Sequence, residues 1–176
     1  AGFTHWAKLN NLKQAAKTMN FLTEHGISSY GELESKLTAI SARRDTAHAE
    51  IKRIESRSAE LALVMKHAGT YRQLKPLYER YRKSNDKEKF LRGHESEIIL
   101  FEAAARELKR LGTVPLPTTE SMKTELANLN AEKERLLAEY KAARAEAQEY
   151  ETVKQNVDAL LTVAKEQEQQ RRHELE

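Results

Sequence analysis

The chain has 176 residues, of which 32% are charged and 39% hydrophobic, and its formal net charge is +3. It contains no cysteine, which excludes disulfides and thiolate metal sites and fits a reducing cytoplasm, the compartment that we expect. No apolar run approaches the roughly 18 residues of a membrane span, and nothing resembles a signal peptide, so we expect no membrane contact. The abundance of Ala, Glu, Lys, Leu and Arg is typical of coiled coils and long helices.

The first element that the sequence predicts is a short amphipathic helix over residues 1–26, packed on a helical rod. Gly26 suits the position just after a helix, where a left-handed residue costs least. Ser29 then predicts the N-cap of the next helix, with Glu32 as its capping-box partner. Phe3 and Trp6 are interpreted as anchors of the first helix. Its apolar residues recur at spacings of three and four: Trp6, Leu9, Leu12, Ala16, Met19 and Leu22.

Two longer stretches carry heptad seams and predict the two arms of an antiparallel coiled coil, residues 29–66 and 119–162. Four polar residues interrupt the seams, and such positions commonly fix register: Arg44, Ser58, Lys133 and Lys154. The first seam runs Leu33, Leu37, Ile40, Arg44, Ala47, Ile51, Ile54, Ser58, Leu61 and Met65. The second runs Met122, Leu126, Leu129, Lys133, Leu136, Tyr140, Ala143, Ala147, Tyr150, Lys154, Val157 and Leu161.

Residues 67–118 between the arms predict a small helical cap. Pro76 either kinks its first helix or lies in the first turns of that helix. Residues 84–86 predict a stop and a new N-cap. The second helix of the cap runs to Gly112, and Gly93 bends or splits it.

An extended loop with two prolines follows the cap, and Thr118 or Thr119 caps the last helix. Residues 163–176 have almost no apolar face and predict a frayed helix or disorder. The predicted fold class is therefore all-α: an elongated antiparallel coiled coil with a small helical cap at one end.

Catalytic and metal-binding motifs are missing from the sequence. None of the six histidines lies four residues from another, and no Glu-x-x-His pair of the di-iron type occurs. The six glycines form no phosphate-binding loop. We therefore predict no catalytic residue, no metal site, no cofactor and no enzymatic activity for this chain.

The most unusual stretch is residues 70–94, where three tyrosines lie among eight cations. With three anions, the local net charge is +5, above that of the whole chain. Such cations displace counterions from nucleic-acid phosphates, and tyrosines can stack on unpaired bases. The alternative is that the tyrosines form the core of the cap and the cations a solvated face, partly neutralised by the pairs Glu79/Lys83 and Glu88/Arg92. The candidate nucleic-acid-binding residues are Arg72, Lys75, Arg80, Arg82, Lys83, Lys87, Lys89 and Arg92.

Three segments resemble the C-terminal region of relaxases, the mobilisation nucleases of conjugative and mobilisable elements of Gram-positive bacteria. They are NLKQAAKTMNFLTEHGI (11–27), TYRQLKPLYERYRKSNDKEKFLRGHESEIILFEAAARELK (70–109) and QEYETVKQNVDALL (148–161). In that family an N-terminal domain does the nicking, with a tyrosine nucleophile and a histidine cluster that holds a divalent metal. Neither matches this sequence, so the resemblance implies the helical tail of a larger relaxase and carries over no catalytic residue.

The resemblance implies a non-catalytic accessory role in DNA mobilisation. The expected partners are DNA, either single-stranded or transfer-origin duplex, and an accessory or coupling protein of the transfer apparatus. A purely structural role is the alternative, with the helical arms as a spacer or as the interface of a homodimer.

Overall fold

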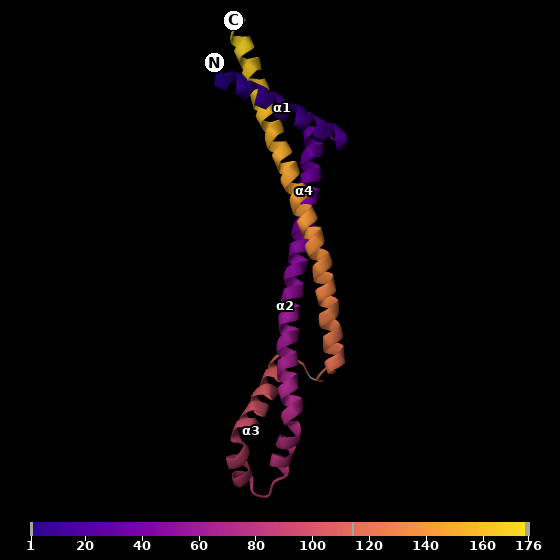
Figure 1. Cartoon of the computed structure of the whole chain (residues 1–176), viewed down its shortest axis with the longest axis vertical. Helices are drawn as coiled ribbons and strands as arrows, with labels where there is room; N and C mark the ends of the chain where they lie inside the picture. The colour runs from indigo at the N-terminus through magenta and orange to yellow at the C-terminus, as the bar shows by residue number, and fades with distance from the viewer. Residues whose placement is uncertain (1, 114, 175–176) are drawn as a thin grey trace. The chain divides into compact units, whose positions relative to one another are not determined.

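The computed structural model describes residues 2–113 and 115–174, with side chains from Asn10 onward. Four helices follow one another along the chain: α1 (Gly2–Glu24), α2 (Tyr30–Lys83), α3 (Lys87–Arg110) and α4 (Thr119–His173), all labelled in Figure 1. The described residues contain no strand. The predicted all-α class is confirmed.

The chain divides into two compact units, and the long helices α2 and α4 each contribute to both. Unit 1 consists of Ala1–Ala49 and Leu137–Glu176, and unit 2 is Glu50–Leu136. The predicted start of the cap at residue 67 lies inside α2, whereas its predicted end at residue 118 is the residue before α4.

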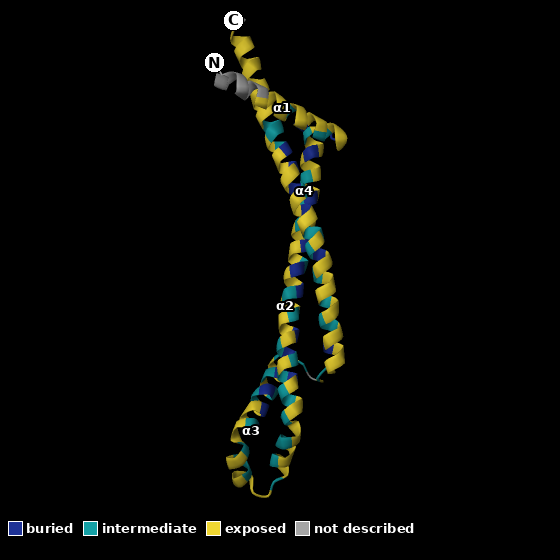
Figure 2. Cartoon of the chain, in the orientation of Figure 1, coloured by how far each residue is buried: buried dark blue, intermediate teal, exposed yellow. Residues whose placement is uncertain are grey.

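Unit 1 is held together by α1 and by the facing parts of α2 and α4, which run in opposite directions. Its contacts pair rising residue numbers on α2 with falling numbers on α4: Tyr30 with Asp158, Arg43 with Glu146, and His48 with Tyr140. In Figure 2, buried positions recur along the facing sides of these helices. The buried core comprises Ile27, Leu33, Ile40, Ala147, Tyr150 and Val153.

The face that α1 buries agrees only in part with the predicted one, since Leu22 of the predicted stripe packs against the core of unit 1. Leu12 and Met19 are 67% and 57% exposed, and Ala16 is exposed as well. Thr18 is instead only 2% exposed. Its hydroxyl donates to the Gln14 carbonyl and accepts from the Asn156 side chain of α4. The hydroxyl is satisfied inside the interface, so burying it carries little of the usual polar penalty. Phe3, Trp6 and Leu9 lie outside the described side chains.

The helix ends in unit 1 follow the predicted capping chemistry with one difference. Gly26 has φ 61°, its N–H bonds to the Thr23 carbonyl, and the Ile27 N–H bonds to that of Leu22, which is a Schellman motif. The Ser29 hydroxyl accepts from the Glu32 N–H as expected. The Glu32 carboxylate, however, accepts from the N–H of Ser28, one residue before the N-cap. Hydrogen bonds from Ser28 lower the pKa of Glu32.

Unit 2 packs the second part of α2 against α3 and the first part of α4. Cross-helix ion pairs join Lys133 to Glu55 at 3.0 Å and Arg57 to Glu125 at 2.7 Å. The first of these pairs is the main reason why the pKa of Glu55 is lowered. The buried core comprises Leu61, Val64, Ala68, Leu108 and Met122.

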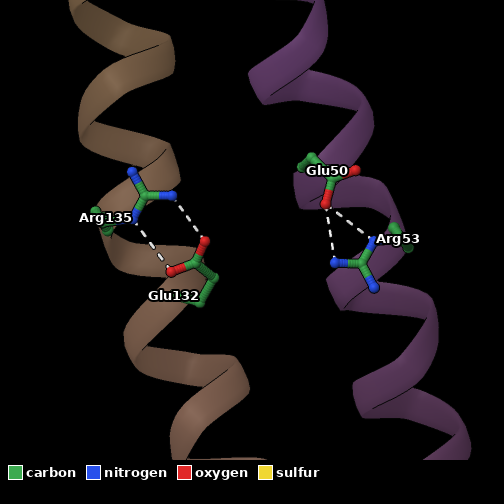
Figure 3. Close-up of polar contacts among 4 residues, drawn as sticks. All are labelled: Glu50, Arg53, Glu132 and Arg135. Atoms are coloured by element: carbon green, nitrogen blue, oxygen red, sulfur yellow. Dashed lines mark hydrogen bonds and ion pairs between the residues drawn. The ribbon is translucent and has the colours of Figure 1, made fainter.

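Further ion pairs in unit 2 lie within single helices. Two of them are drawn in Figure 3. Arg53 pairs with Glu50 of α2 at 2.9 Å, and Arg135 pairs with Glu132 of α4 at 2.7 Å. Both are spaced by three residues, so they support their own helices. The guanidinium of Arg135 also lowers the pKa of Glu132.

Helix α2 continues through Pro76 to Lys83, so the proline lies in the helix interior and not in its first turns. Asp86 is the N-cap of α3 and accepts from the Lys89 N–H at 3.0 Å, as the sequence predicts. The predicted interruption near Gly93 falls on His94, whose φ and ψ of −141° and 25° are not helical. Gly112 ends α3 with φ 69°.

Helix α4 begins after Thr118, whose hydroxyl accepts from the Ser121 N–H at 3.1 Å. The buried part of the α4 heptad seam ends before Leu161, the last predicted seam residue, because Leu161 is 46% exposed. The polar stretch from residue 163, expected to be frayed or disordered, is helical to His173 with its side chains exposed.

The four polar seam residues are all half-buried and differ in their partners. Lys133 and Lys154 reach across to α2: Lys133 pairs with Glu55, and Lys154 lies 5.3 Å from the Tyr30 ring centroid. Arg44 bonds to its neighbour Asp45. The Ser58 hydroxyl is buried and finds no hydrogen-bond partner among the described residues.

Candidate nucleic-acid interface

The three tyrosines of residues 70–94 pack against α3. Tyr71 and Tyr78 both stack on Phe101, with ring centroids 4.9 and 4.2 Å away and interplanar angles of 22° and 24°. The ring centroids of Tyr81 and Phe90 lie 6.1 Å apart. Phe101 is buried and the tyrosines are half-buried. The tyrosines therefore form the core of the α2–α3 pair, which leaves part of each tyrosine open to solvent.

The eight candidate cations lie on the last turns of α2 and the first turns of α3, and every one of them is exposed. We call this set the basic cap. Figure 1 shows how the short connection of residues 84–86 returns the chain from α2 to α3, so that the two groups of cations meet at one end of unit 2. The basic cap comprises Arg72, Lys75, Arg80, Arg82, Lys83, Lys87, Lys89 and Arg92.

Two of these cations have partners within the fold. The Arg72 guanidinium donates to the Thr119 hydroxyl at 2.8 Å and to the Pro117 carbonyl, so it fastens the loop before α4. The Arg80 guanidinium lies 5.8 Å from the Phe90 ring centroid, a cation–π distance.

The neutralising pairs expected within the basic cap are not formed. Among the described residues, neither Glu79 and Lys83 nor Glu88 and Arg92 come within ion-pair distance. Among the described side chains, no carboxylate pairs with Lys83 or Arg92, so their ammonium and guanidinium groups can meet an anionic partner.

A groove of about 500 Å³ lies between α2 and α3 beside the stacked rings. We call it the aromatic groove, because Tyr71, Tyr78 and Phe101 line it. Lys75 and Arg82 of the basic cap contribute to its wall. The other lining residues are Glu79, Glu102, Ala105 and Arg106.

Two lining residues were not predicted as site residues: Arg106 lies outside the basic stretch of residues 70–94, and Glu102 was interpreted as part of a solvated helix face. Helical spacing gives no signal for Arg106, because five residues after the buried Phe101 is about 140° around the helix from that ring. Arg106 lines the groove from outside the apolar face of α3.

The described residues contain neither a candidate metal cluster nor a membrane-spanning helix. No group of three or more of their His, Asp and Glu side chains is arranged to hold a metal. None of the described helices has an apolar stretch long enough to cross a bilayer.

Comparisons with known proteins return no relatives. No family model matches the chain, and no curated protein and no solved structure matches it either.

Proposed function

We propose that this chain is a non-catalytic accessory region of a DNA-mobilisation relaxase, and that it contacts DNA through the basic cap. The proposed setting is the cytoplasm, beside a transfer origin. The family assignment rests on the resemblance of residues 11–27, 70–109 and 148–161 alone. The DNA contact rests on one observation: eight exposed cations gather at one end of unit 2.

Physical chemistry supports DNA as the ligand of such a surface. Each cation that meets a phosphate releases condensed counterions, and this release supplies most of the affinity of a sequence-independent contact. Long exposed lysine and arginine side chains adapt to a backbone without a preformed pocket. Arg72 is the exception in the set, because the loop before α4 already occupies its guanidinium.

A double substitution tests the proposal. Arg80→Ala with Arg82→Ala removes two charges from the basic cap, and the matched control, Lys141→Ala with Arg144→Ala, removes two exposed charges from α4 in unit 1. We expect weaker DNA binding, measured by fluorescence anisotropy, only in the first variant. The slope of log affinity against log salt should flatten by nearly 0.9 per lost phosphate contact on duplex. Equal affinities of wild type and variant at low salt would refute the DNA contact.

Within each unit, we propose that α2 and α4 pair as an antiparallel coiled coil. The heptad spacing of buried residues supports this, since Leu33, Ile40, Ala47 and Ile54 recur every seven residues and all are buried. The opposite order of their contact partners supports it too. Paired cysteines at positions 43 and 146 should therefore crosslink under mild oxidation, whereas cysteines at 43 and 158 should not.

Protein docking is the second candidate function, and exposed apolar side chains of unit 1 favour it. Such a surface suits a transfer protein or a second copy of the chain. Sedimentation across a range of concentrations tests the second copy: a mass that rises with concentration indicates a homodimer. A constant mass argues against a homodimer and leaves a spacer or a different protein partner. The exposed residues are Leu12, Met19, Leu160, Leu161 and Val163.

A further inference from the structure

We propose that the aromatic groove holds an unpaired base of single-stranded DNA, so that the basic cap selects single strands over duplex. This inference rests on the proposed DNA contact and adds the kind of strand that is bound. Its test is designed so that the two ideas can fail separately.

The size and the lining of the groove fit a base. Pockets for small ligands usually measure about 300–1,000 Å³, and this groove has about 500 Å³. Tyr71 and Tyr78 are half-buried, and both line the groove beside Phe101. The rings are held in place by stacking on Phe101, so little side-chain entropy is lost when a base stacks against them.

The polar groups of the groove fit the two parts of a nucleotide. Lys75, Arg82 and Arg106 bring positive charge to its wall, as a phosphate requires. The Tyr78 hydroxyl donates to a Glu102 carboxylate oxygen at 3.5 Å, and the carboxylate still has acceptor capacity on this side of the groove. Carboxylates accept from the amino groups of base edges, whereas they repel the acidic peptides that a purely basic groove would also attract.

The basic cap extends from this groove, which explains why the strand would remain there. Lys75 and Arg82 belong to both surfaces, so a strand with one base in the groove has its neighbouring phosphates beside further cations. A duplex offers the same phosphates, but its bases are paired and stacked and reach the groove only after costly unstacking. Single-strand preference is the direct consequence.

The test compares three labelled ligands at the same low salt: a short single strand, the same strand with abasic sites in place of its bases, and the corresponding duplex. Stacking of one base on an aromatic side chain corresponds to about 5- to 150-fold in affinity. We expect the intact strand to bind tighter than the abasic strand and the duplex by a factor in this range. Equal affinity for the three ligands would overturn the inference and leave the DNA contact standing. Absence of binding to all three would overturn the DNA contact itself.

A groove-filling variant locates the base. Ala105→Phe places a ring in the aromatic groove without a change of charge, and Ala62→Phe makes the same change at an exposed position of α2 that does not line it. We expect Ala105→Phe to lower affinity for the intact strand to the abasic level, with abasic and duplex binding unchanged. An unchanged single-strand preference in a folded Ala105→Phe protein would place the base elsewhere.

A second readout needs no substitution and covers the case in which Ala105→Phe does not fold. A strand that carries one 2-aminopurine is titrated with the wild-type protein, since stacking on an aromatic ring quenches the emission of this base. Quenching that saturates together with the anisotropy signal supports the inference. Constant emission through a completed binding curve overturns it.

Discussion

The Tyr30 hydroxyl donates a hydrogen bond of 2.6 Å to the Asp158 carboxylate and so joins the first turn of α2 to α4. Lys154 reaches the same carboxylate at 3.2 Å. The hydroxyl is the main cause, and the ammonium a smaller one, of an Asp158 pKa below its ordinary value of 3.8. Two charged groups and a phenol thus fix one end of the α2–α4 pair in unit 1.

Tyr30→Phe is expected to lower the melting temperature by a few degrees near neutral pH, because the Asp158 carboxylate loses its donor. A depressed carboxyl pKa stabilises the fold above its unfolded value and loses this effect as pH falls through the folded value. The difference between wild type and variant should therefore shrink as the pH falls below 3.8. Thermal melts followed by circular dichroism measure it, and a difference that persists unchanged in acid would contradict the role of Asp158.

Leu33→Ala and Leu12→Ala make the same chemical change at two positions of unit 1. Leu33 is 1% exposed and Leu12 is 67% exposed. We expect Leu33→Ala to lower the free energy of unfolding by about 2–5 kcal/mol, whereas Leu12→Ala leaves it within about 0.5 kcal/mol. Denaturant titration provides the comparison. A large loss for Leu12→Ala would mean that α1 buries the face predicted from its sequence.

Ser58→Ala is expected to stabilise the protein, since it removes a buried hydroxyl that has no hydrogen-bond partner in the described part of the chain. Such a group costs about 1–3 kcal/mol, and alanine is also the better helix former. Ser56→Ala isolates the propensity effect, because Ser56 is exposed on the same helix two residues away. If the two variants gain equal stability in denaturant titrations, the Ser58 hydroxyl carries no penalty.

Asp86→Ala and Asp86→Asn separate two effects of Asp86: its hydrogen bond as the N-cap residue of α3, and its negative charge beside the cations of the basic cap. The alanine variant loses the acceptor for the Lys89 N–H and should cost about 0.5–2 kcal/mol, whereas asparagine can still serve as an N-cap. Both remove one anion beside Lys87 and Lys89, so both should bind DNA more tightly than wild type at low salt. Thermal melts and anisotropy report the two effects. If neither variant binds DNA more tightly than wild type, the result argues against DNA contact at this turn.

The sequence predicts helix ends at Gly26 and Asp86 because these depend on local chemistry, whereas the boundary predicted at residues 66–67 falls inside α2. Gly26 and Asp86 take the positions expected of them, since a left-handed residue and a capping carboxylate act within one turn. The seam residues of α2 are buried or half-buried as the heptads predict. The heptad period was sufficient for this prediction, because α2 and α4 both carry long apolar seams.

The inner face of α1 could not be predicted in the same way. Its apolar stripe at Leu12 and Met19 is as regular as the seams, but the buried residue is Thr18, which is satisfied by Asn156 from the other end of the chain. A polar contact between residues 138 positions apart leaves no periodic signal. The aromatic groove escaped prediction for a similar reason, since Glu102 and Arg106 join it only once Phe101 packs against Tyr71 and Tyr78.

The division of the chain has a consequence for the order in which it folds. Unit 2 is one continuous stretch, Glu50–Leu136, whereas unit 1 needs two segments that are separated by that whole stretch. Closing a long loop costs more entropy than closing a short one, and contacts between distant residues form late. We therefore expect the α2–α3 turn and its neighbours to nucleate and the α2–α4 pairing to spread from there. The contact between Tyr30 and Asp158 would be among the last to form.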